Sequence, residues 1–308
     1  MKTETFAFTG CNGTSLPAVI WQPEREVKAV LQVAHGMTEH MGRYERFAAD
    51  LCAQGVAVAG FDLRGHGKNG GNSDVASCGE GGWGACIEDM RLFFELLEQR
   101  FPGVPHYMLG FSLGSFLLRE YLTKYPAEGE VAGAIIAGTG HQPVWLLSVM
   151  MGLVKGQIQK AGYDRTTDLV RQLSFGTYNQ KFKPNRTTAD WLCSDEAELD
   201  QYLADPLVRK DISAGLFYEL LGSMKRTASH FEYDGWDTSL PILFISGEDD
   251  PVGDCGKGVQ VIYKRMKKTG MENVTLRLFE NARHDIFHEE ANSVAETVRG
   301  CICQWLLQ

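Results

Sequence analysis

Apolar segments of strand length alternate with amphipathic segments of helix length along most of this chain. Residues 27–34, 56–61, 106–111 and 131–137 are short apolar runs, and residues 113–124 carry apolar side chains at helical spacing. Consecutive strand–helix–strand units predict a mostly parallel sheet with right-handed crossovers and helices on both faces. In such a sheet, functional groups gather in the loops at the carboxyl ends of the strands.

The same patterns predict further elements on either side of this region. An Asn12-Gly13 turn signal lies between two alternating segments at the start of the chain and predicts a hairpin. The further predicted elements are strands at residues 3–8, 16–22, 241–246 and 274–279 and helices at residues 42–54, 84–100, 255–269 and 288–307.

The alternation stops between residues 140 and 236, which read as helices and loops without a clear strand. We interpret this stretch as an insertion that splits one α/β domain. The predicted core therefore comprises residues 1–139 and 237–308, and residues 140–236 form a helical cap above the strand ends.

Charge and cysteine usage exclude several classes of function. The formal net charge is −9, and no run of Lys and Arg offsets it, which argues against a nucleic-acid partner. Of eight scattered cysteines only Cys301 and Cys303 are close-spaced, without a second ligand pair, so we expect no metal and no cofactor. The first residues lack the apolar stretch of a signal peptide, which favours a cytoplasmic protein with reduced thiols.

The segment Gly110-Phe111-Ser112-Leu113-Gly114 matches the pattern G-x-S-x-G. It joins a predicted strand to a predicted helix. In such a turn the serine hydroxyl points away from the sheet, and small residues two positions before and after it avoid a clash. This context favours Ser112 as a nucleophile over a surface serine in a glycine-flanked turn.

A loop that could stabilise an oxyanion follows the strand predicted at residues 27–34. An oxyanion hole needs two backbone N–H groups, one of them from the residue after the nucleophile, here Leu113. We assign the second to Met37. Gly36 lets the backbone approach a substrate, and His35 is expected to shape the loop rather than carry a proton.

A serine nucleophile of this kind is followed along the chain by an acid and then by a histidine. Residues 242–246 are an apolar strand that leads to Gly247, Glu248, Asp249 and Asp250. Only one carboxylate needs to hold the histidine tautomer. Pro251 fixes the chain just after Asp250 and favours it over Asp249, while the other acidic residues would form a solvated turn.

Three histidines compete for the role of general base. His284 lies in the loop after the last predicted strand, at the edge of the sheet where Ser112 is expected. His288 is assigned to the final helix, and His66 to the ordering of the glycine-rich turn around it. His284 is therefore the predicted base.

Several motifs together resemble one known family. The chain resembles the monoglyceride lipase and lysophospholipase-like branch of the α/β-hydrolases, also called serine aminopeptidase-like hydrolases. The motifs that carry the resemblance are His35-Gly-Met-Thr-Glu-His-Met-Gly-Arg-Tyr, Asp62-Leu-Arg-Gly-His-Gly, Gly110-Phe-Ser-Leu-Gly-Ser, Gly247-Glu-Asp-Asp-Pro-Val and Arg283-His-Asp-Ile-Phe-His-Glu.

The resemblance implies an α/β-hydrolase fold, with an eight-stranded sheet and a helical cap over the site. It assigns the same roles to Ser112, Asp250 and His284, with Met37 and Leu113 as oxyanion donors. Phe111 departs from the family, because many relatives have His before the nucleophile, and this difference concerns the shape of the pocket.

The segment at residues 144–154 is apolar nearly all round. Two interpretations stay open: it lines an acyl tunnel or touches a membrane as a lid, or it packs between cap and core. Trp191 and Phe182 are expected to reach the mouth of the pocket. The predicted substrate-binding residues are His35, Gly36, Phe111, Trp145 and Met150.

These features together predict a cofactor-independent serine hydrolase. It would cleave carboxylic esters of small or lipid-like acyl substrates through an acyl-enzyme. An apparent pKa near ~6–7 is expected in the pH dependence of kcat/KM, reporting neutral His284. An amidase or aminopeptidase with the same three residues, and a non-catalytic binding protein on the same fold, stay open as alternatives.

Overall fold

The sheet at the centre of this computed structural model has eight strands. The structure describes residues 1–125, 131–228 and 236–308. The strands are β1 (Lys2–Thr9), β2 (Ser15–Gln22), β3 (Ala29–Ala34), β4 (Val56–Phe61), β5 (Val75–Ala76), β6 (His106–Phe111), β7 (Gly133–Ala137), β8 (Asp211–Ile212), β9 (Ile242–Gly247) and β10 (Val274–Phe279). The helices are α1 (Glu45–Ala53), α2 (Gly82–Arg100), α3 (Leu113–Lys124), α4 (Val144–Ala161), α5 (Asp168–Ser174), α6 (Glu196–Ala204), α7 (Ala214–Thr227), α8 (Lys257–Lys268) and α9 (Val294–Leu306).

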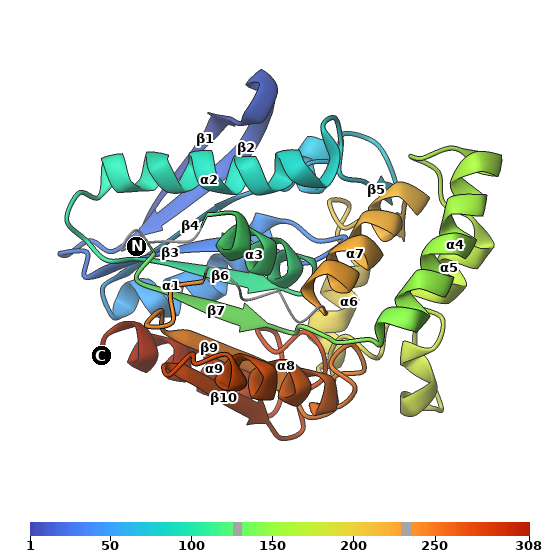
Figure 1. Ribbon diagram of the computed structural model, residues 1–308. Coiled ribbons are helices and arrows are strands. Elements are labelled where there is room, and N and C mark those ends of the chain that lie inside the picture. Colours follow the sequence, from blue (N-terminus) through green and yellow to red (C-terminus); the bar gives the residue numbers. More distant parts are fainter. Residues whose placement is uncertain (126–130, 229–235) are drawn as a thin grey trace.

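The strand order in this sheet is β1-β2-β4-β3-β6-β7-β9-β10 (Figure 1). The strands from β4 to β10 pair in parallel, while β2 runs antiparallel to both β1 and β4. Every residue of β3, β4 and β9 is buried, as expected for strands covered on both faces. The predicted α/β-hydrolase fold with a mostly parallel eight-stranded sheet is confirmed.

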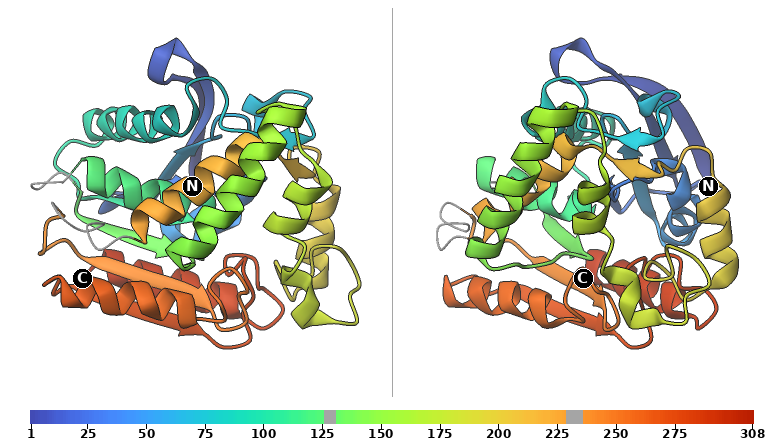
Figure 2. Two further views of the ribbon diagram at one scale, coloured as in Figure 1. Left: turned by 45° about the vertical axis from the view of Figure 1, so that its right-hand side comes forward. Right: turned by 90° about the vertical axis from the view of Figure 1, so that its right-hand side faces the viewer.

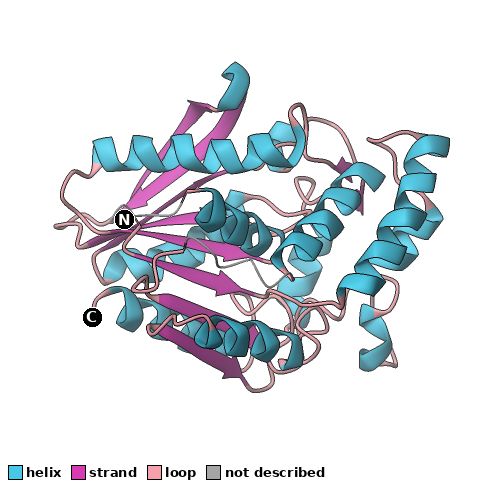
Figure 3. Cartoon of the chain, viewed as in Figure 1, coloured by secondary structure: helices cyan, strands magenta, loops and turns pink. Residues whose placement is uncertain are grey.

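Helices cover both faces of this sheet (Figure 3). On one face α2, α3 and α8 contribute apolar side chains to a large core cluster, for example Phe93, Leu117 and Ile262. On the other face α1 and α9 form a second cluster that includes Phe47 and Ile302. Because the two clusters hold the strands in place, the loops at their carboxyl ends have a rigid base.

The described chain from α4 to α7 lies at the carboxyl-end side of the sheet (Figure 2). It carries α4, α5, α6 and α7, with α4 packed against α7. It also contains β8, which pairs in parallel with β5 in a two-stranded sheet. The prediction that this stretch lacks a strand was therefore wrong at residues 211 and 212, which are too short a segment to show a period.

The last helix begins six residues later than the sequence suggested. We predicted a helix from residue 288, but α9 begins at Val294. The preceding Ser293 has φ 55°, and the carboxylate of Glu289 accepts hydrogen bonds from the N–H groups of Ser194 and Arg283. These interactions hold the chain in a loop, so the assignment of His288 to the final helix was wrong.

Two other helices also begin differently from the prediction, because of the local backbone conformation. The helix predicted from residue 255 begins at Lys257, because Asp254, Cys255 and Gly256 all have positive φ. The helix predicted from residue 42 begins as a 3₁₀ turn, Met41–Tyr44, and continues as α1. Helix ends depend on such local backbone states, which hydrophobic periodicity does not encode.

Candidate active site

Ser112 lies in a strained turn between β6 and α3. Its backbone has φ 50° and ψ −113°, a conformation that L-residues rarely adopt. A Cβ atom at Gly110 would collide with the carbonyl group of Gly114, and one at Gly114 with that of Ala34. The two glycines of the motif are therefore required for the turn that exposes the Ser112 hydroxyl.

Three side chains from loops far apart in the sequence meet at this turn. His284 Nε2 lies 2.9 Å from Ser112 Oγ, and His284 Nδ1 lies 2.9 Å from Asp250 Oδ1. Because an ionised carboxylate only accepts, Nδ1–H donates to Asp250, and Nε2 is left to accept from the Ser112 hydroxyl. This arrangement allows the imidazole to take a proton from Ser112.

Asp250 is fully buried and held by further donors. The N–H of Val252 donates to its Oδ1 at 2.8 Å, and the Ser246 hydroxyl lies 3.3 Å from its Oδ2. Asp249, the rival acid, instead pairs with Lys181 at 2.7 Å, and both side chains are more than 40% exposed. The structure thus places Asp250, and not Asp249, beside His284.

Electrostatic interactions favour the protonated form of His284. Burial of the imidazole opposes protonation, but the charge of Asp250 and its hydrogen bond, together with the charges of Asp285 and Glu39, raise the pKa of His284 above its ordinary value. The site is therefore suited to stabilise the imidazolium that forms when Ser112 loses its proton.

The loop after β3 lies next to Ser112. The Leu63 N–H donates to His35 Nε2 at 2.9 Å, so His35 Nδ1–H donates to the Gly36 carbonyl at 2.8 Å. His35 is fully buried, and burial lowers its pKa. Both ring nitrogens of His35 are thus used to shape the loop that carries Gly36 and Met37.

The N–H of Leu113, the predicted oxyanion donor next to the nucleophile, lies at the start of α3. Leu113 is the first residue of α3, and the first N–H groups of a helix have no intrahelical acceptor. The positive end of the helix dipole adds to the attraction for an anion at this point.

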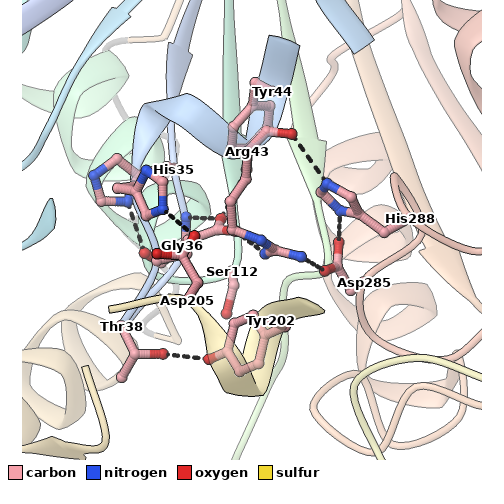
Figure 4. A network of polar contacts seen from close by, with 12 residues as sticks. His35, Gly36, Thr38, Arg43, Tyr44, Ser112, Tyr202, Asp205, Asp285 and His288 are labelled. Atoms are coloured by element: carbon pink, nitrogen blue, oxygen red, sulfur yellow. Dashed lines mark hydrogen bonds and ion pairs between the residues drawn. The ribbon is translucent and has the colours of Figure 1, made fainter. Parts of the chain in front are cut away.

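A buried polar network connects the loop after β3 to the loop that carries His284 (Figure 4). Glu39 accepts hydrogen bonds from the Gly36 N–H at 2.6 Å and the Tyr44 hydroxyl at 2.8 Å, and it pairs with Arg43. Arg43 also pairs with Asp285, the residue after His284, at 2.8 Å. Arg43 therefore joins the candidate oxyanion loop to the candidate base loop.

His288 and the chain between β7 and β9 extend this network. His288 Nδ1 lies 2.8 Å from Asp285, and its Nε2 lies 3.1 Å from the Arg43 carbonyl. The Thr38 and Tyr202 hydroxyls are hydrogen-bonded at 2.7 Å. Sequence reasoning missed Glu39, Arg43 and Asp285 as parts of the site, although all three lie within the motifs that suggested the family.

The other predicted site residues lie at different depths. Phe111 is 3% exposed, and its ring packs against that of His284. Met150 is half-buried against the core, whereas Trp145 is 69% exposed on the outer side of α4. His66 is buried in its turn, where Nδ1–H donates to the Arg64 carbonyl at 2.8 Å, and it does not contact Ser112.

Trp191 reaches the site from the chain between β7 and β9. It is 7% exposed, and the centroid of its ring lies 5.2 Å from that of His284. The Phe182 ring packs against the Arg283 guanidinium, whose Cζ lies 4.4 Å from the ring centroid. Trp191 is therefore in direct contact with the candidate base.

No cluster of metal-binding side chains is present at this site or elsewhere in residues 1–125, 131–228 and 236–308. Cys301 and Cys303 both lie on α9, and Cys303 packs in the apolar cluster that α1 and α9 form.

Comparisons with known proteins agree on the kind of fold. Residues 25–291 match the family described as Serine aminopeptidase, S33. The monoacylglycerol lipase of Mycolicibacterium smegmatis is 26% identical over 297 residues, which cover 92% of this chain and 90% of the relative. The monoglyceride lipase of Homo sapiens is 26% identical over 290 residues, covering 94% and 85%. A carboxyl esterase from Bacillus coagulans has a similar structure, with a TM-score of 0.87, 24% identity and full coverage of both chains.

Proposed function

Because this chain belongs to the serine aminopeptidase S33 family of α/β-hydrolases, we propose that it hydrolyses carboxylic esters with small or lipid-like acyl groups. The observation that carries the proposal is the line of two 2.9 Å contacts from Asp250 through His284 to Ser112. Relatives named as monoacylglycerol lipases and esterases support the same reaction class.

In the proposed reaction, His284 Nε2 removes the proton from Ser112 as Oγ attacks the ester carbonyl. The N–H groups of Met37 and Leu113 donate to the oxyanion. The imidazolium then protonates the leaving alcohol, and an acyl-enzyme remains on Ser112. His284 next removes a proton from water, which attacks the acyl group, and the acid leaves as Ser112 regains its proton.

We also propose that residues 1–139 and 237–308 form the hydrolase core and that residues 140–236 form a lid. All eight strands of the main sheet come from the proposed core ranges. The proposed lid places the Trp191 ring against His284 and hydrogen-bonds the Tyr202 hydroxyl to that of Thr38, so it would cover the loops on both sides of Ser112.

A panel of substrates tests the reaction class. We expect kcat/KM for a monoacylglycerol to exceed that for a lysophospholipid or an aminoacyl amide by ~10-fold or more, a difference of about 1.4 kcal/mol in activation free energy. The measurement is release of the acid or amine under identical conditions. A preference for the aminoacyl amide would show instead that the protein is an aminopeptidase that uses the same three residues.

The outer side of α4 suggests how a lipid substrate is reached. Trp145, Val149 and Leu153 are 69%, 54% and 46% exposed, and their spacing places them on one side of the helix. The exposed Lys160 lies on the same side near the end of the helix, and the exposed Lys155 lies further round it. An apolar strip with cations on the same helix fits an anionic lipid surface, and we propose that α4 touches the surface that supplies the substrate. No described helix has the length and apolar character needed to cross a membrane.

Vesicle binding tests this contact. The double variant Trp145→Ser, Leu153→Ser should bind vesicles of phosphatidylcholine and phosphatidylglycerol about tenfold more weakly in a sedimentation assay, because it removes two buried apolar groups from the bound state. Leu203→Ser, at a similarly exposed position on α6, is the matched control and should bind normally. Wild-type protein that stays in the supernatant would contradict the proposal.

A further inference from the structure

The imidazole of His284 lies against two aromatic rings from different parts of the chain. The Phe111 ring, before the nucleophile, has its centroid 5.0 Å away with an interplanar angle of 33°. The Trp191 ring lies 5.2 Å away with an interplanar angle of 34°. Both aromatic side chains are less than 10% exposed. The candidate base is thus bordered by aromatic faces as well as by its hydrogen-bond partners.

Hydrogen bonds fix Trp191 to the loop that carries His284. The Trp191 carbonyl accepts from the His284 N–H at 3.4 Å, and the Leu192 carbonyl accepts from the Asp285 N–H at 2.7 Å. On either side of this pair, the Trp191 N–H donates to Asn179 at 2.9 Å, and the Ser194 N–H donates to Glu289 at 3.0 Å. Residues 190–194 therefore form a strip docked on the base loop.

Two further aromatic rings pack against the indole of Trp191. The Tyr178 ring centroid lies 4.9 Å from that of Trp191, and the Phe175 ring lies 5.8 Å from it in a stacked arrangement. With its backbone bonded and its ring packed, Trp191 has little freedom to leave the imidazole. Its position is set by the fold and does not depend on a bound substrate.

We propose that Trp191 is a positioning residue for His284, which acts with Phe111 to hold the imidazole on the line between Ser112 and Asp250 and to favour its positively charged form. The faces of aromatic rings attract cations, and the attraction is stronger where water is excluded. The inference rests on the proposed function, in which His284 becomes an imidazolium in both halves of the reaction.

The carboxylates around His284 favour its positively charged form, as the rings do. Asp250 bonds to Nδ1, while Asp285 and Glu39 act through space, and Arg43 partly neutralises both of them by its ion pairs. These groups are the same in Trp191 variants, so a change in the titration of His284 can be assigned to the ring.

Two variants distinguish the effect of an aromatic ring on His284 from the effect of any apolar side chain that covers the imidazole. Trp191→Leu keeps an apolar side chain over the imidazole but removes the ring, and Trp191→Phe keeps a ring. We expect Trp191→Leu to lower kcat on a short p-nitrophenyl ester about three- to tenfold with little change in KM. The acid limb of its kcat/KM profile should move to lower pH, because neutral His284 is the active form and its protonated form loses a stabilising contact. Trp191→Phe should restore most of both properties.

A titration that needs no turnover separates this inference from the proposed function. In Ser112→Ala protein with isotope-labelled histidine, NMR should show His284 titrating at a lower pH in the Trp191→Leu background than in the Trp191→Phe background. This result stands even if the protein hydrolyses no ester. Trp305→Leu removes a half-buried tryptophan that packs on Tyr107, remote from the site, and serves as the control for general destabilisation.

The outcomes that overturn the inference are specific. Equal His284 titration in the Leu and Phe backgrounds would show that the ring has no effect on the charge of the imidazole. A raised KM with unchanged kcat in Trp191→Leu would place Trp191 in substrate binding instead. Loss of activity in Trp191→Phe as large as in Trp191→Leu would also reject a role for the aromatic face.

Discussion

Replacement of Ser112 by alanine is expected to lower kcat for ester hydrolysis by about 10⁴- to 10⁶-fold. The reason is that Ser112 Oγ is the atom 2.9 Å from His284 Nε2, and alanine leaves the imidazole with no hydroxyl to deprotonate. A fluorophosphonate probe measures the same group directly, because Oγ forms a bond to phosphorus as fluoride leaves. Labelling of wild-type protein should disappear in Ser112→Ala.

Ser115→Ala is the matched control for this variant. Ser115 lies one helical turn further along α3, and its hydroxyl donates to the Ser112 carbonyl at 2.6 Å rather than to His284. We expect Ser115→Ala protein to keep its labelling. Absence of labelling in folded wild-type protein would instead favour the alternative of a non-catalytic binding protein on this fold.

Hydrophobic periodicity was enough to predict a mostly parallel sheet, whereas its eight strands were expected from the resemblance to the family. The fully buried β4 and the mostly buried β6 read as short apolar runs, and α3 has apolar residues at helical spacing. The bounds of β4, β6, α3 and β10 match the predicted ranges. The meeting of Ser112, Asp250 and His284 was also predictable, because each follows the carboxyl end of a strand in one parallel sheet. Their catalytic roles stay predictions.

Contacts between distant segments were not predictable from local pattern. Arg43 binds Glu39 four residues away and Asp285 more than two hundred residues away, and only the second contact connects the two loops of the site. The docking of residues 190–194 on the base loop is likewise made by backbone groups, which every residue type provides. Hydrophobic periodicity carries no information about such bonds, so neither feature could be predicted from the sequence.

The role of Asp250 can be tested by the same substitution at two neighbouring positions. Asp250→Asn is expected to lower kcat by about 10⁴-fold while leaving the fold intact. The amide can donate to His284 Nδ1 and so place the imidazole proton on Nε2, where it blocks acceptance of the Ser112 proton. Loss of the Asp250 charge should also lower the pKa of His284, since that charge is the largest influence that raises it. Steady-state kinetics across pH, with circular dichroism for folding, measures both effects.

Asp249→Asn makes the identical chemical change one residue earlier and is therefore the control. Asp249 is 45% exposed and pairs with Lys181, and exposed ion pairs contribute little to stability. We expect its kcat to stay within about threefold of wild type. If Asp249→Asn loses activity and Asp250→Asn keeps it, the acid has been assigned to the wrong residue. If both keep it, His284 needs no carboxylate, and the proposed proton-transfer line fails.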